Sequence, residues 1–228
     1  MMQLSLFEQT FKQYQRLIFF DLETTGFSPT HDDIIELGLV IVDPHQDFRV
    51  VKMDNVLIKA SKPLPQKIVE LTNITDAMLQ RDGIEPKALH QRLQSYLKEP
   101  ALWLAYNMQF DLGFLIAFMK RHDPSFVFKD DIFDVMAAYK DYNVPPHRLM
   151  HAIARYNIVF ENTHRALDDV LATVEVFKAL SNDADLVPYI NVIGYHETYG
   201  LKGPKLPHVT YLPQKNERES LKNALKKV

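Results

Sequence analysis

The chain of 228 residues contains no cysteine. This absence excludes disulfide bonds, thiolate metal ligands and cysteine nucleophiles together, and it fits a cytoplasmic protein. Long apolar runs are also missing, since no stretch approaches the roughly 20 residues that a membrane-spanning helix needs. The first residues carry neither the basic start nor the small-residue cleavage site of a secretory signal. We therefore expect a cytoplasmic protein that has no membrane segment.

An excess of one charge sign is lacking as well, since the formal net charge is only −3. From residue 200 onward, however, seven basic and two acidic residues give +5, which leaves −8 for the rest of the chain. The net negative charge of residues 1–199 does not favour nucleic-acid binding unless some of their carboxylates hold metal ions. The basic end can contact phosphates or be a solvated chain end, and both interpretations stay open.

The periodicity of apolar residues predicts an α/β domain over residues 15–182. It follows an N-terminal extension (1–14) and precedes a Pro/Gly-containing basic tail (183–228), in which we expect mostly irregular structure. Strand patterns occupy residues 17–22, 33–43, 48–60 and 101–107. Helical patterns occupy residues 85–99, 110–122, 134–141, 147–157 and 165–180, with a short helical stripe in 216–228.

The segment FFDLETTG (19–26) ends a predicted buried strand with two carboxylates. Because side chains alternate along a strand, Asp21 and Glu23 share one face and Leu22 lies on the other. Neighbouring carboxylates repel each other, and a hard divalent cation would relieve that repulsion. The plain alternative is a solvated strand end. The Thr-Thr-Gly that follows is a turn whose donors are suited to a sugar or a phosphate.

Two further acidic segments are candidates for the same site. In AYNMQFDLGFL (105–115), Asp111 begins an apolar helix, where an acid can also simply complement the helix dipole. In NTHRALDDV (162–170), His164 and two aspartates could supply a base and a metal ligand, or could form an ordinary acidic helix start. Helical periodicity leaves the choice between Asp168 and Asp169 open.

In order and spacing, DLETTG, N-x-x-F-D and H-R-A-L-D-D resemble the three motifs of the DEDDh family of 3′–5′ exonucleases. That family includes the proofreading (epsilon) subunit of bacterial DNA polymerase III. The resemblance covers roughly residues 16–180, and IIELGLV and LTNIT also look like family segments. It implies a ribonuclease-H-like fold, in which helices flank a mixed five-stranded sheet.

The resemblance also implies a site for two divalent cations, Mg²⁺ or Mn²⁺, and a histidine base. The implied metal ligands are four carboxylates: Asp21, Glu23, Asp111 and Asp169. Asp21 would bridge the two ions. His164 would accept the proton of the attacking water, a task for which an unperturbed histidine pKa of about 6.5 is suited. The family spacing H-x-A-x-x-D selects Asp169 rather than Asp168.

Hydrolysis at such a site would release nucleoside 5′-monophosphates from the 3′ end of a strand. By the same resemblance, the substrate pocket would comprise Thr24, Thr25, Phe27, Asn107 and Phe110. The two threonines would meet the terminal sugar. The two phenylalanines would flank the last base, unless they are ordinary core residues. Tyr106 stands where many family members have histidine, a departure that leaves the metal ligands unchanged.

The expected substrate is a single-stranded or frayed 3′ end of DNA, and a DNA polymerase subunit is a candidate partner. The alternatives are an RNA 3′–5′ exonuclease of the same family and a non-catalytic nucleic-acid-binding module. A binding module gains nothing from acidic groups that repel phosphate.

His147 and His151 have a zinc-ligand spacing, but the sequence between them lacks the glutamate that a metalloprotease would use as a base.

The apolar N-terminal segment QLSLF (3–7) resembles the short peptide by which bacterial polymerases and repair enzymes bind the sliding clamp. In that motif a glutamine and two apolar anchors enter a pocket of the clamp, and the residues expected to bind it here are Gln3, Leu4, Leu6 and Phe7. Such a tether would raise the local concentration of the enzyme at 3′ ends. The alternative is a docking helix with an apolar stripe made of Leu4, Phe7, Phe11 and Tyr14. Leu6 alone falls outside that stripe.

Overall fold

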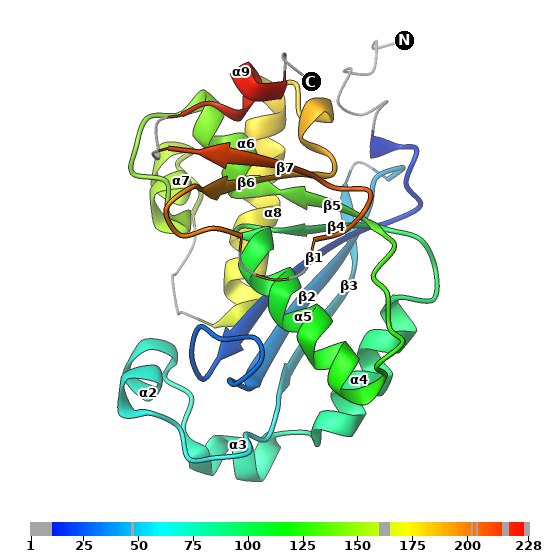
Figure 1. Ribbon diagram of the computed structural model, residues 1–228, viewed down its shortest axis with the longest axis vertical. Coiled ribbons are helices and arrows are strands. Elements are labelled where there is room, and N and C mark those ends of the chain that lie inside the picture. Colours follow the sequence, from blue (N-terminus) through cyan, green and yellow to red (C-terminus); the bar gives the residue numbers. More distant parts are fainter. Residues whose placement is uncertain are drawn as a thin grey trace.

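The computed structural model describes residues 11–46, 48–159, 165–201, 203, 205–215 and 219–225. Its centre is a sheet of five strands: β1 (Leu17–Thr24), β2 (Ile34–Asp43), β3 (Arg49–Leu57), β4 (Leu102–Ala105) and β5 (Asp131–Asp134). The strand order is β3-β2-β1-β4-β5 (Figure 1). β1 is antiparallel to β2 and β2 to β3, whereas β1, β4 and β5 run parallel. This mixed sheet confirms the architecture that the sequence predicted.

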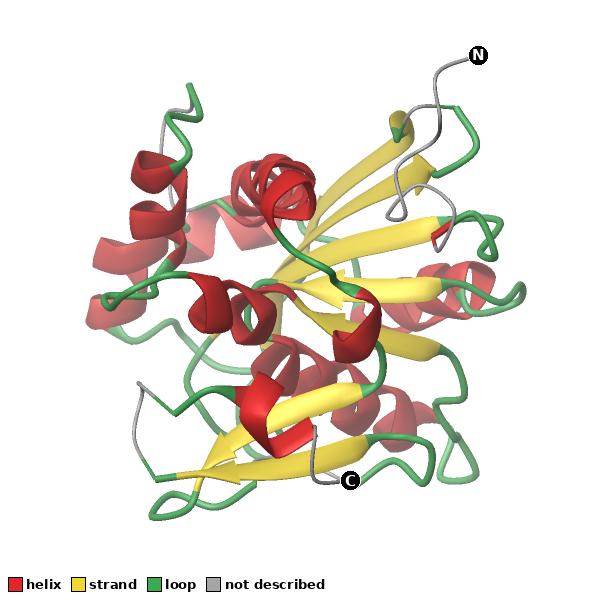
Figure 2. Ribbon diagram, turned by 90° about the horizontal axis from the view of Figure 1, so that it is seen from above, coloured by secondary structure: helices red, strands yellow, loops and turns green. Residues whose placement is uncertain are grey.

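Helices cover both faces of the sheet (Figures 1 and 2). The helices before residue 184 are α2 (Gln66–Thr72), α3 (Asp76–Asp82), α4 (Pro86–Tyr96), α5 (Met108–His122), α6 (Val135–Tyr142), α7 (Leu149–Arg155) and α8 (Ala166–Asp183). Of these, α2 and α3 lie beyond the lower end of the sheet in Figure 1. The helical patterns between residues 85 and 180 are confirmed as α4 to α8, with ends that lie within a few residues of the expected ones. Among the described residues, no helix combines the length and apolar character that crossing a bilayer requires.

Strand β1 separates two hydrophobic cores. Phe20 and Leu22 lie in the core that includes residues of α4 and α5. Phe19 lies in the other core, which includes residues of α8. Side chains alternate along the strand, so Asp21 and Glu23 share the face of Phe19 and point toward the α8 side. The expected placement of both carboxylates on one face is confirmed.

Part of the chain beyond α8 is regular where we expected mostly irregular structure, so that expectation is wrong for residues 187–189, 192–196 and 210–214. A short 3₁₀ helix, η1 (Val187–Tyr189), leads into two parallel strands, β6 (Val192–His196) and β7 (Thr210–Gln214). Helix α9 (Leu221–Leu225) follows. Pro213 lies inside β7, where it is tolerated because β7 pairs with a neighbour on one side only.

Contacts with the main sheet hold this C-terminal unit in place. The side-chain oxygen of Asn191 accepts the N–H of Ile132 at 2.9 Å, and its amide donates to Asp131 at 2.7 Å. Ile193 and Leu212, from β6 and β7, are buried in the two cores. These contacts join residues far apart in the chain, and the local Pro- and Gly-rich sequence does not reveal them.

The described part of the chain begins at Phe11, whose side chain is fully buried. Its ring packs edge-on against Phe177 of α8, with 5.3 Å between the ring centroids. The Tyr14 hydroxyl donates to the carboxylate of Asp131 at 2.6 Å. These two members of the predicted apolar stripe therefore fix the start of the domain. The candidate clamp segment (3–7) lies outside the described residues.

Candidate active site

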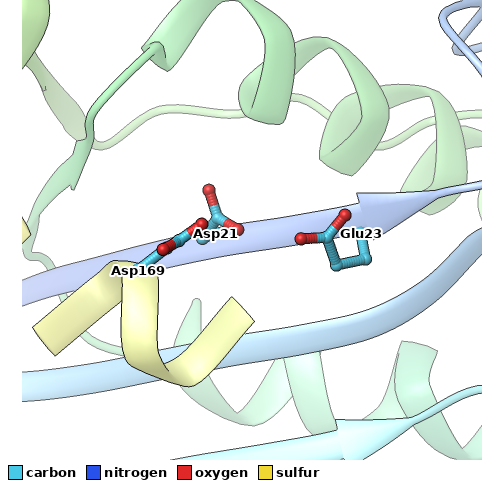
Figure 3. A group of neighbouring side chains, drawn as sticks. All are labelled: Asp21, Glu23 and Asp169. Atoms are coloured by element: carbon cyan, nitrogen blue, oxygen red, sulfur yellow. The ribbon is translucent and has the colours of Figure 1, made fainter. Parts of the chain in front are cut away.

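Three carboxylates meet where β1 approaches the start of α8. Asp21 and Glu23 come from β1, and Asp169 comes from the first turn of α8 (Figure 3). Each offers an oxygen, and these oxygens all lie within 4.8 Å of one another. The choice that periodicity left open is thereby decided, since Asp169 belongs to the group and Asp168 does not.

Asp111 stands outside this group of three but close to it. It lies in the first turn of α5 with its side chain buried, and its carboxylate accepts the N–H of Leu22 at 3.1 Å. α5 follows β4, which runs parallel to β1, so the carboxyl ends of both strands lie at the same edge of the sheet. The charge of Asp111 is the largest contribution of any neighbouring group to the raised pKa of Asp21.

The electrostatics of the group favour a bound cation. Burial raises the pKa of Asp21 well above its ordinary value, and the surrounding carboxylates raise it further. Burial also raises the pKa of Glu23 to about 8, with added repulsion from Asp169 and Glu36 and partial relief from Arg165. Clustered carboxylate oxygens are the donors that hard divalent cations prefer, so the residues present fit such an ion.

Glu36 is an organising residue that the sequence reasoning missed. Its carboxylate is fully buried on β2, where Glu36 pairs in register with Glu23. Arg165 binds it through two nitrogens, with 2.6 Å between Nη2 and Oε1, and the Ala166 N–H donates to Oε2 at 3.1 Å. Glu36 therefore fixes the first residues of α8, the helix that carries Asp169. A single acid within the apolar segment IIELGLV was the available signal.

Gly38 is the second residue that was missed. It lies directly opposite Asp21 in the β1–β2 register. A Cβ atom at Gly38 would stand 2.3 Å from the backbone carbonyl carbon of Ala166, well inside any real contact distance. The start of α8 therefore packs against the bare backbone of β2, and this close approach brings Asp169 to Asp21.

The turn after β1 is held by its own polar groups. The Thr24 hydroxyl donates to the Gly26 carbonyl at 2.7 Å, and the Thr25 hydroxyl accepts the N–H of Asp33 at 2.9 Å. Asp32 accepts the N–H of Ser28 at 2.8 Å. A Cβ atom at Gly26 would meet the Asp32 carboxylate at 2.4 Å, so glycine there leaves room for that side chain to bind the Ser28 N–H.

The other expected pocket residues lie along the entrance to α5. Phe27 is 76% exposed, which excludes the core interpretation for this side chain. Its ring meets Phe110 edge-on, with 6.4 Å between the centroids, and Phe110 itself is partly buried. Asn107 is exposed at the N-cap of α5. Tyr106 is buried and its hydroxyl donates to the His147 carbonyl at 2.7 Å, so it supports α7 instead of facing the pocket.

His164 lies outside the described residues, which resume at Arg165. The two histidines with a zinc-ligand spacing lie near α7. His147 is buried, and its Nε2 is 3.0 Å from the Asn143 carbonyl. His151 lies within α7.

Known proteins resemble this chain in sequence. The model of an exonuclease family, the RNase T type, matches residues 18–177. The PolC-type DNA polymerase III of Clostridium perfringens is 32% identical over 181 residues, which cover 74% of this chain and 12% of that protein. The Bacillus subtilis enzyme of the same name is 30% identical over 171 residues, which cover 73% and 11%. The chain thus spans about an eighth of the length of these relatives.

Solved structures resemble the chain in fold. The zinc-bound complex of Escherichia coli exonuclease I with single-stranded DNA aligns with a TM-score of 0.68 and 24% identity, covering 75% of this chain and 41% of that one. A complex described as ExoI/SSB-Ct aligns with a TM-score of 0.65 and 21% identity, covering 75% and 42%. These alignments confirm the ribonuclease-H-like fold.

Proposed function

The chain belongs to the exonuclease family, and from this premise we propose that it is a metal-dependent 3′–5′ exonuclease acting on DNA. Residues 15–182 would form the exonuclease domain, and the products would be nucleoside 5′-monophosphates. The observation that carries the proposal is the convergence of Asp21, Glu23 and Asp169 within 4.8 Å, from two segments far apart in the chain.

We propose two divalent cations, Mg²⁺ or Mn²⁺, held by Asp21, Glu23, Asp111 and Asp169. Bound there, the cations would neutralise charge on the phosphoryl oxygens and lower the pKa of water. Asp21 is central in this arrangement, since the other three carboxylates all act on its pKa. Asp111 adds rigidity, because its hydrogen bond to the Leu22 N–H ties α5 to β1 between Asp21 and Glu23.

His164 is the proposed general base, which would take a proton from the attacking water. What supports this assignment is its neighbour in sequence. Arg165 is bound to the buried Glu36 on β2, with 2.6 Å between Nη2 and Oε1. Arg165, which follows His164 in the sequence, therefore lies next to β2, the strand that pairs with β1.

We propose that the 3′-terminal nucleotide lies against the turn after β1 and the first turn of α5. Thr24 and Thr25 would meet its sugar, and Phe27 and Phe110 would enclose its base with Asn107 alongside. The high exposure of Phe27 supports this, because an aromatic ring held edge-on to a second ring and open to solvent offers a face for a base.

DNA is favoured over RNA because the two relatives described above, from Clostridium perfringens and Bacillus subtilis, are DNA polymerases. A purely binding function is not favoured. Clustered buried carboxylates offer phosphate no favourable contact, and without a cation they destabilise the fold, because burial and mutual repulsion oppose their ionisation.

The test is to incubate the purified protein with 3′-labelled single-stranded, mispaired and duplex DNA, and with RNA of matched sequence. Each substrate is given Mn²⁺ or EDTA. We expect mononucleotide release from DNA with Mn²⁺, more slowly from RNA, and none in EDTA. Asp21→Asn should abolish release, while Asp168→Asn should keep it. Faster release of mononucleotides from RNA would reverse the substrate assignment. Undiminished release in EDTA would contradict the metal-dependent mechanism.

We also propose a role at replicating or repaired DNA in the cytoplasm, with a DNA polymerase subunit as partner and residues 3–7 bound to a sliding clamp. The clamp motif, through Gln3, Leu4, Leu6 and Phe7, supports the second partner.

A peptide of residues 1–12 should bind a bacterial clamp with a Kd below ~100 μM, and Leu6→Ala or Phe7→Ala should weaken this binding. Weaker binding of the unaltered peptide would leave the docking-helix alternative.

A further inference from the structure

A groove opens beside the candidate active site, between the first turn of α5 and the β6–β7 unit. Asn107 and Phe110 form its α5 side, and His196 and Tyr199 form the opposite side. On a helix, residues three and four positions apart share a face, so Phe110 and Asp111 both follow Asn107 within one turn. One turn is about 5.4 Å of helix length. Asn107 and Phe110 also belong to the pocket proposed for the 3′-terminal nucleotide, so the groove and that pocket share these two side chains.

The β6 side of the groove presents two aromatic rings. Tyr199 is 75% exposed, and its ring centroid lies 4.8 Å from that of His196. The turn that carries them is fixed, because the N–H groups of Tyr199 and Gly200 both donate to the His196 carbonyl, at 3.2 and 2.9 Å. Gly200 has a φ of +65°, which favours glycine. An exposed tyrosine ring beside a half-buried histidine ring, both on a fixed turn, is a platform on which bases stack.

Hydrogen-bond donors complete the groove. The Nδ1 atom of His196 accepts the N–H of Thr198 at 3.1 Å, which leaves the proton of the neutral ring on Nε2. Lys140 of α6 lines the same groove, and among the described residues it makes no ion pair. An ammonium group beside a stacking platform matches the alternation of phosphate and base along a single strand.

We propose that this groove binds the single-stranded nucleic acid immediately 5′ of the nucleotide being removed. Bases would stack on Tyr199 and His196, and a phosphate would contact Lys140. The inference rests on the proposed exonuclease function and adds to it a binding site for the part of the strand that is not being removed. The platform lies beyond residues 18–177, the region that the exonuclease family model matches.

The experiment compares the wild-type protein with Tyr199→Ala on two substrates, the p-nitrophenyl ester of thymidine 5′-monophosphate and the oligonucleotide (dT)12. On (dT)12 we expect KM to rise by about 5- to 100-fold with kcat little changed, the size of one lost base–aromatic stack. On the nitrophenyl ester, which has no nucleotide 5′ of the one removed, kcat/KM should stay the same. Tyr199→Phe should behave like the wild type, since it keeps the ring.

A second variant tests the phosphate contact. Lys140→Gln should weaken (dT)12 binding and reduce the slope of log K against log salt by about one. Lys87→Gln is the matched control, because Lys87 is an exposed lysine of α4, an element that does not line the groove. It should change neither quantity.

The outcomes separate the groove from the function on which it rests. An active protein whose KM for (dT)12 is unchanged by Tyr199→Ala would overturn the groove alone. A wild-type protein inactive on both substrates would overturn the proposed function. In that case, fluorescence anisotropy of labelled (dT)12 in EDTA would still show whether the groove binds single-stranded DNA. Weaker binding by Tyr199→Ala would support it, and equal binding would reject it.

Discussion

At the scale of single residues, the site is defined by carboxylates that oppose one another. Burial is the main cause of the raised pKa of Asp21, and the neighbouring acids add to it. The metal-free protein must therefore either keep several charges together or take up protons that the unfolded chain would not bind. Both choices lower its stability at high pH, and a bound cation would remove the need for either.

We expect Asp21→Asn in EDTA at pH 8 to melt about 3 °C or more above the wild-type protein, because one of the opposing groups loses its charge. The folded-state pKa of Glu23 is about 8, above its ordinary value of 4.5, so the metal-free protein loses stability as the pH rises through this range. The melting advantage should therefore shrink toward pH 5. Calorimetry at both pH values measures it.

Asp168→Asn is the control for this comparison, since it removes the same charge from the same turn of α8 outside the cluster. Its effect on the melting temperature should be smaller. A melting temperature of Asp21→Asn below that of the wild type, in EDTA at pH 8, would contradict the repulsion argument.

The raised pKa of Glu23 also predicts how metal binding depends on pH. Because the pKa of Glu23 is about 8, its carboxyl group carries a proton at lower pH in the metal-free protein, and this proton must leave when a cation binds. The apparent affinity for Mn²⁺ should then rise about tenfold per pH unit from pH 6 to 8 for each proton displaced. Calorimetric titration in buffers of different ionisation enthalpy counts the protons. Affinity independent of pH in this range would show that Glu23 is already ionised.

At the scale of elements, the position of α8 relative to β2 builds the site. Gly38 lets the two backbones touch, and the Arg165–Glu36 pair fixes where the helix begins. Glu36 is fully buried, so its charge depends on Arg165 and on the Ala166 N–H. Asp169 lies four residues after Arg165, and its N–H donates to the Arg165 carbonyl at 3.1 Å, so its position follows from that anchor.

We expect Arg165→Gln to lower the free energy of unfolding by about 3 kcal/mol, because it leaves a buried carboxylate without its cation. Exonuclease activity should fall as well, since the first turn of α8 loses its anchor. Urea denaturation measures the first effect and single-turnover assays the second. Lys178→Gln breaks the surface pair with Glu175 on the same helix and should cost less than about 1 kcal/mol.

A double-mutant cycle separates the pair from its surroundings. In the Arg165→Gln protein, the further change Glu36→Gln should restore part of the lost stability, because no uncompensated charge then stays buried. If the two single changes simply add, Glu36 and Arg165 do not act as a unit, and the anchor argument is wrong.

At the scale of the whole molecule, both ends of the described chain converge on β5. Asp131 accepts the Tyr14 hydroxyl through one carboxylate oxygen and the Asn191 amide through the other. Asn191 also accepts the N–H of Ile132. The last strand of the main sheet is therefore covered by the segment that leads into β6, which protects an edge that would otherwise be open to pairing.

We expect Asn191→Ala to lower the free energy of unfolding by about 2 kcal/mol more than Asn157→Ala does. Both asparagines have a positive φ, 57° and 52°, so both alanines carry similar backbone strain. Asn157 is exposed just after α7. Asn191→Ala, by contrast, would leave the Ile132 N–H without its acceptor. Urea denaturation of the two variants measures the difference, and equal losses would show that the C-terminal unit is not held by this residue.

The sequence by itself determined the local features of this protein. Alternation along β1 placed Asp21 and Glu23 on one face, and apolar periodicity located α4 to α8. Motif spacing then selected Asp169 over Asp168. These features depend on neighbours within a few positions, where backbone geometry and side-chain period act directly.

Only the tertiary structure decided what depends on distant neighbours. Glu36 and Arg165 are 129 positions apart, and nothing local to either residue identifies the other. Gly38 is essential only because α8 starts above it, and β6 and β7 are strands only because they pack on the main sheet. Such contacts have a physical cause that no local pattern carries, since their energy exists only once the intervening chain has folded and brought the partners together.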